Sequence, residues 1–89
     1  MSIQSTLAER GKNYGKFSEH ARITQGIKRA MEDSPNWIYL ANDQREALEM
    51  VAHKIGRILN GDRDFHDSWH DISGYITLVA DRLKPETED

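Results

Sequence analysis

The stretch Phe65-His-Asp-Ser-Trp-His-Asp-Ile-Ser-Gly-Tyr-Ile-Thr-Leu-Val-Ala-Asp-Arg-Leu83 decides the fold that this sequence predicts. Its apolar side chains follow one another at alternating steps of four and three, the spacing of a helix face that packs on another helix. They are Phe65, Trp69, Ile72, Ile76, Val79 and Leu83. Asp67 and Asp71 fall off this stripe, one turn apart on one flank, at about 100° per residue. The stretch therefore predicts a helix with an apolar seam and two acids turned away from it.

Apolar periodicity and helix start and stop residues along the rest of the chain predict three more helices, over residues 2–10, 19–32 and 42–59. Ser18 is the expected N-cap of the second, and Asn42 or Asp43 that of the third. Asn60-Gly61 is a typical helix end, and Pro85 stops the last helix near residue 84.

Short connections set the expected topology. The loop at 62–64 makes the helices over 42–59 and 65–84 an antiparallel hairpin. The apolar run at 37–40 is expected to pack as a plug between helix pairs, or else to extend a helix. The prediction is a single all-α domain of four helices over residues 1–84, with 85–89 as a flexible acidic tail.

Composition narrows the class of protein. The 89 residues contain no cysteine and carry a net charge of −3, divided as +4 over residues 1–30, −2 over 31–60 and −5 over 61–89. No apolar run is long enough for a membrane span and no signal sequence opens the chain, so a cytoplasmic protein is expected. The acidic balance makes nucleic acid an unlikely partner. Leu78 and Met50 lie well off the apolar stripes, so we expect a homo-oligomer, a dimer or higher.

Acidic side chains at helical spacing form the first candidate site. Glu46 and Glu49 make an E-x-x-E pair on a polar face that also carries His53 and Arg57. Two carboxylates at this spacing can hold a hard divalent cation, and a hairpin could bring Asp67 and Asp71 toward them. The alternative is a solvated outer face. His66 and His70, four residues apart, could bind a transition metal, although exposed histidines are the more common reading.

Basic side chains form the second candidate site. Lys54 and Arg57 could bind phosphate or pair with Asp67 and Asp71 in a structural ion network, and the sequence favours neither. The glycine-containing loop at 10–16 offers further cations and one aromatic ring for a ligand. These side chains are Arg10, Lys12, Tyr14 and Lys16. Gly74, inside a predicted helix, suggests close approach of another backbone or a ligand, with Tyr75 beside it.

Three segments together carry a resemblance that covers residues 10–83. They read Arg-Gly-x-x-Tyr14-Gly-x-Phe17, Lys54-x-x-Arg57 and Asp67-Ser-x-x-Asp71-Ile-x-Gly-Tyr75. This pattern resembles a small family of phage and prophage proteins of uncharacterised function. That family is in turn distantly similar to the all-α nucleotide pyrophosphohydrolases of the MazG and dUTPase type. Those enzymes hold magnesium with an E-x-x-E and a later E-x-x-D pair, whereas Asp67 and Asp71 stand four apart.

The resemblance implies a phage-encoded, nucleotide-handling protein. As an enzyme it would be a magnesium-dependent nucleoside triphosphate pyrophosphohydrolase, with Mg²⁺ on Glu46, Glu49, Asp67 and Asp71. Asp71, Asp67, Glu49 and Lys54 would be its catalytic residues, and Arg10, Lys12, Tyr14, Lys16, Arg57 and Tyr75 would bind the triphosphate. The alternative is a non-catalytic accessory protein that binds a host or phage protein through an exposed helical face. Dispersal of the four carboxylates over open surface would favour this alternative.

Overall fold

A computed structural model of the chain describes residues 3–4, 6 and 15–85. Its elements are α2 (Phe17–Glu32), the 3-10 turn η1 (Trp37–Tyr39), α3 (Asn42–Asn60) and α4 (His66–Leu83). No strand occurs among the described residues, so the all-α prediction is confirmed. Of the predicted first helix, residues 3, 4 and 6 are helical and the rest lies outside the described residues, as do residues 86–89 of the predicted tail.

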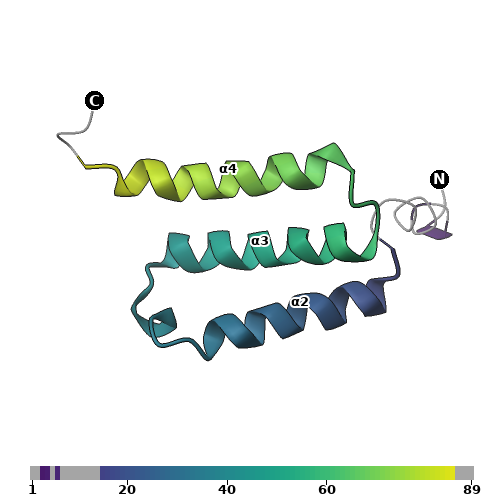
Figure 1. Ribbon diagram of the computed structural model, residues 1–89, viewed down its shortest axis with the longest axis horizontal. Helices are drawn as coiled ribbons and strands as arrows, with labels where there is room; N and C mark the ends of the chain where they lie inside the picture. The colour runs from purple at the N-terminus through teal and green to yellow at the C-terminus, as the bar shows by residue number, and fades with distance from the viewer. Residues whose placement is uncertain (1–2, 5, 7–14, 86–89) are drawn as a thin grey trace.

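The three helices lie side by side in one layer (Figure 1), with α3 between α2 and α4. The predicted antiparallel hairpin of α3 and α4 is confirmed. The Arg82 guanidinium near the end of α4 pairs with Asp43 in the first turn of α3, and its Nη2 lies 2.8 Å from Asp43 Oδ1. The Lys54 ammonium lies 2.9 Å from Asp71 Oδ2 farther along the hairpin. These two ion pairs fix the register of the two helices.

The helix ends follow the predicted stop signals but not the predicted caps. The Gly61 amide donates to the Arg57 carbonyl at 2.8 Å and closes α3, and α4 ends just before Pro85. Ser18 is not a cap, because α2 already begins at Phe17 after an extended Lys16. At the start of α3 the Gln44 side chain accepts from the Ala41 amide at 2.8 Å. This contact satisfies one amide that the helix leaves unpaired.

The buried side of α4 differs from the predicted apolar seam. Trp69, Ile76 and Leu83 are exposed, and Leu59 of the predicted α3 stripe is exposed as well. The side chains of α4 that are buried or half-buried are instead Ser68, Asp71, Ile72, Tyr75 and Val79, together with Phe65 just before the helix. Asp71, predicted to lie off the apolar seam on one flank, is half-buried beside α3, where it pairs with Lys54, one of the two alternatives that the charges left open. A layer gives α4 one neighbour, so its buried arc is narrow, and the rotation that pairs Asp71 with Lys54 turns half of the stripe outward.

The apolar run at residues 37–40 does not form the predicted plug. Trp37–Tyr39 forms a 3-10 turn at the surface, where Ile38 and Tyr39 are exposed. Arg45 holds this turn, because its guanidinium donates to the Trp37 and Ile38 carbonyls at 3.2 and 2.9 Å. A single layer of helices has no gap between helix pairs for such a plug to fill.

The core of the described chain is small. Its buried apolar residues are Ala47, Ala52 and Ile58, all on the central helix. Alanine allows neighbouring helices to approach α3 closely, but it contributes little apolar area. The layer therefore keeps two broad faces on which side chains remain accessible.

Candidate functional site

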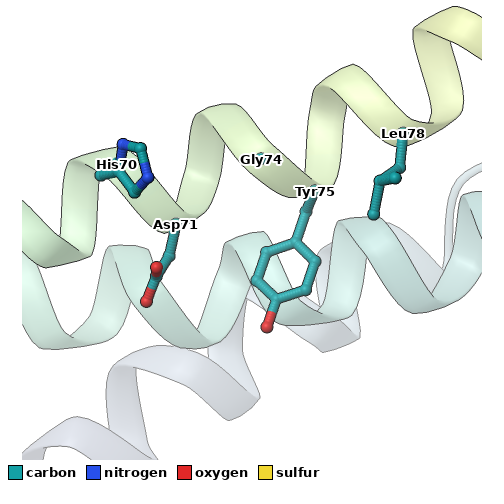
Figure 2. Close-up of a pocket in the computed structure, with 5 residues that line it drawn as sticks. All are labelled: His70, Asp71, Gly74, Tyr75 and Leu78. Atoms are coloured by element: carbon teal, nitrogen blue, oxygen red, sulfur yellow. The ribbon is translucent and has the colours of Figure 1, made fainter.

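A hollow of about 360 Å³ lies on one flank of α4 and is lined by His70, Asp71, Gly74, Tyr75 and Leu78 (Figure 2). Their spacing of one, three and four residues puts them on one side of the helix. Figure 2 shows Asp71, Tyr75 and Leu78 pointing the same way from α4, with the bare backbone of Gly74 between them. An ideal Cβ at Gly74 would meet no atom of the described chain within 4 Å. The missing side chain therefore leaves this space open.

The wall of the hollow nearest α3 carries a partly buried ion pair. Lys54 is only 9% exposed, and its ammonium lies 2.9 Å from the Asp71 carboxylate. The hydrogen bond from Lys54 holds the pKa of Asp71 below its usual value. A nearly buried ammonium needs a carboxylate because desolvation of an unpaired charge is costly. Asp71 thus has a structural task that competes with metal binding or catalysis.

The other side of α3 carries a pair of histidines. His20 Nε2 of α2 and His53 Nδ1 of α3 are 3.2 Å apart, and the two rings meet edge to face. His20 is 6% exposed, and its Nδ1 has no hydrogen-bond partner among the described residues. Burial first, and the nearby positive charge of Arg57 second, lowers the pKa of His53 to about 4. Burial also lowers the pKa of His20.

These shifts keep both imidazoles neutral near pH 7, so one ring can donate to the other. The Thr24 hydroxyl lies 3.5 Å from His20 Nε2 and is itself buried. Gly56 makes this contact possible, because an ideal Cβ there would meet Thr24 Oγ1 at 2.2 Å. A buried hydroxyl and a buried imidazole cannot reach a dissolved substrate. The cluster therefore has a structural role, in which buried polar contacts join α2 to α3.

The four predicted metal ligands do not come together. Glu49 faces α2, where its carboxylate is 4.0 Å from the Lys28 ammonium, and Glu46 is exposed on α3. Asp67 is exposed, 3.8 Å from the His66 ring. In the register set by the ion pairs, Glu46 lies level with Val79, so Asp67 is about 18 Å away along the axis. Within the described part of the chain, no three metal-binding side chains of this kind form a group.

The predicted substrate-binding residues are also separated. Lys16 lies before α2, and its carbonyl accepts hydrogen bonds from the His20 amide and, at 2.7 Å, from Asn60 Nδ2. Arg57 is near His53 on α3. Tyr75 lines the hollow. Arg10, Lys12 and Tyr14 lie outside the described residues.

His66 and His70, the candidate transition-metal pair, lie side by side on α4, as their spacing of four residues predicts. The rings of His66 and His70 stack 5.6 Å apart, both exposed at the start of α4. The described residues offer no set of three ligands here either. A zinc site normally needs three or four protein ligands, so the pair alone is a poor one.

Sequence reasoning missed His20, Thr24 and Gly56. His20 and His53 are 33 residues apart, and no local pattern links them. The one available signal was a glycine inside a helix, which costs about 1 kcal/mol relative to alanine. The sequence predicts close approach at Gly74, but a Cβ there would meet nothing within 4 Å of the described chain. The helical glycine that lies against neighbouring side chains is Gly56.

The chain shows no match to a protein family, to a curated protein or to a solved structure. The resemblance to phage proteins and to nucleotide pyrophosphohydrolases therefore stays a prediction. None of the helices in the described ranges is long and apolar enough to cross a membrane.

Proposed function

We propose that this chain is a non-catalytic binding module, whose hollow on α4 receives an apolar side chain from a basic segment of another protein. The observation that carries the proposal is the contrast between the carboxylates and the hollow. Asp71 of α4 pairs with Lys54 of α3, and Glu49 of α3 lies 4.0 Å from Lys28 of α2, whereas the hollow beside Gly74 is open. Carboxylates that lie apart do not form a catalytic metal centre. They can instead form an acidic edge around the hollow, where a basic partner would bind.

The apolar part of the contact comes from Leu78, Tyr75 and the bare backbone at Gly74. Leu78 is 71% exposed and borders the hollow. Glycine lets an incoming side chain touch the helix backbone, and an apolar side chain that leaves water gains about 25 cal/mol per Å² buried. The hollow can therefore act as a small anchor pocket of the kind that dominates protein interfaces.

The chemistry of the partner follows from the charge around the pocket. Asp67, Asp71 and Asp81 fall on this side of α4 at about 100° per residue. Residues 61–85 carry five acidic and three basic side chains, a net charge of −2. Lysine or arginine beside the anchor would find carboxylates at the rim, which raises association rates and favours a basic partner over an acidic one. The expected ligand is an amphipathic basic segment.

Two matched synthetic helices test this proposal, one of leucine and lysine and one of leucine and glutamate. We expect the lysine peptide to shift the amide resonances around Gly74 and Leu78, and the glutamate peptide to have no effect. Gly74→Leu fills the hollow and should abolish those shifts, whereas Gly26→Leu on α2 should leave them unchanged. Equal binding of both peptides, or shifts centred elsewhere, would contradict the proposal.

Nucleotide handling remains the second candidate, and one observation favours it. Besides burial, the charges of Arg57, Lys54 and Lys28 lower the pKa of His53, so positive charge gathers where α2 and α3 meet. Such a cluster can attract a polyphosphate. Titration with nucleoside triphosphates, with and without magnesium, and detection of released pyrophosphate test this function. Magnesium-dependent turnover that is lost in Glu49→Gln would establish the enzyme and overturn the non-catalytic proposal.

A further inference from the structure

A second apolar surface runs along the flank of α4 opposite the hollow. Trp69, Ile76 and Leu83 are 56%, 44% and 54% exposed, and they stand seven residues apart. The small exposed residues Ser73 and Ala80 alternate with them. We call these five residues the α4 ridge. Their steps of four and three are those of a helix that packs on another helix, here without a partner in the described chain.

The ridge is complementary to a reversed copy of itself. Trp69 and Leu83 lie at equal distances on either side of Ile76, about 10 Å along the axis in each direction. When two such helices run antiparallel about a two-fold axis at Ile76, each Trp69 meets the partner's Leu83, and Ile76 meets the partner's Ile76. Ser73 and Ala80 leave room between the large side chains. Closed two-fold contacts require this kind of self-complementary patch.

Trp69 is already held in a fixed position. Its indole N–H donates to the Arg63 carbonyl at 2.7 Å, so the polar edge of the ring is satisfied within the chain. The rest of the ring is free to pack without loss of a hydrogen bond. A side chain fixed in advance loses less conformational entropy when an interface forms.

We propose that the α4 ridge is the interface of an antiparallel homodimer with Ile76 on its two-fold axis. Leu78 lies about 160° around the helix from Ile76, so the dimer leaves the hollow open. The dimer is independent of the proposed binding function, because either surface can be occupied without the other.

The mass of the protein in solution tests the dimer. Sedimentation at high micromolar concentration should show twice the 10.3 kDa of one chain. Ile76→Lys places two like charges together on the axis and should give a monomer with unchanged helix content. Leu78→Lys, a matched change on the opposite flank, should leave the dimer intact. A wild-type monomer, or a dimer that survives Ile76→Lys, would overturn the proposal.

Single cysteines test the antiparallel register, because the natural chain has none. Ile76→Cys should form a disulfide with its own copy under mild oxidation, since only residues near a two-fold axis meet themselves. Leu83→Cys alone should not crosslink, but it should do so when mixed with Trp69→Cys. Self-crosslinking of Leu83→Cys as fast as that of Ile76→Cys would indicate a parallel pair and refute this arrangement. Neither outcome bears on peptide binding at the hollow.

Discussion

Substitution of Gly56 by alanine tests the close contact between α2 and α3 most directly. An added Cβ would lie 2.2 Å from Thr24 Oγ1 and 2.9 Å from His20 Nδ1. Both side chains are buried, so neither can swing into solvent, and α2 must move away. Added atoms in a packed site typically cost about 1–3 kcal/mol. Alanine also favours the helix by about 1 kcal/mol over glycine, which offsets part of that cost.

Gly74→Ala is the matched control, because it makes the same chemical change in α4 where a Cβ would contact nothing within 4 Å of the described chain. It should stabilise the protein by up to about 1 kcal/mol. The difference between the two variants isolates the clash, and we expect Gly56→Ala to be the less stable by about 1–3 kcal/mol. Each kcal/mol corresponds to about 4–8 °C in the unfolding midpoint of a domain this small.

Thermal and urea unfolding followed by circular dichroism, at one fixed protein concentration, measures this difference. Thr24→Ala removes the nearest atom, so it should relieve part of the penalty when combined with Gly56→Ala. That double variant should be more stable than the sum of the single changes predicts. The close-contact reasoning fails if Gly56→Ala is as stable as Gly74→Ala, or if the Thr24→Ala effect is simply additive.

Three further predictions follow from the ion pair, the histidines and the 3-10 turn. His53 has a folded pKa of about 4 against 6.5 when unfolded, so the unfolded chain takes up the proton first. Stability should therefore be full above about pH 6.5 and fall between 6.5 and 4, and a urea midpoint that stays constant over that range would contradict this. Asp71→Asn should lower the urea midpoint, because it leaves the Lys54 ammonium without its carboxylate. Adding Lys54→Met to the same chain should restore the midpoint. If the midpoint is not restored, the loss of the ion pair does not explain the destabilisation. Arg45→Ala should alter the fluorescence of Trp37 without loss of helix, and an unchanged spectrum would mean that the turn does not need Arg45.

Local signals in the sequence determined the helical elements. The alternating apolar pattern, the ends at Gly61 and Pro85 and the short connection at 62–64 predicted α3, α4 and their antiparallel pairing. These signals act over a few residues, through backbone geometry and hydrogen bonds at helix ends, and they hold whatever the helices pack against. The pairing of Lys54 with Asp71 was one of the alternatives that the charges allowed.

Tertiary packing decided how each helix is rotated and which side chains meet. Ile76 and Val79 belong to one stripe in the sequence, but Ile76 is exposed because α3 is the one described helix that packs closely on α4. Glu46 and Asp67 are both acidic and helical, yet the register of the hairpin keeps them apart. His20 meets His53 because Gly56 lets two helices approach. A periodic pattern fixes the shape of one helix, whereas a site depends on the rotation and register of several, which are set by contacts between residues far apart in the chain.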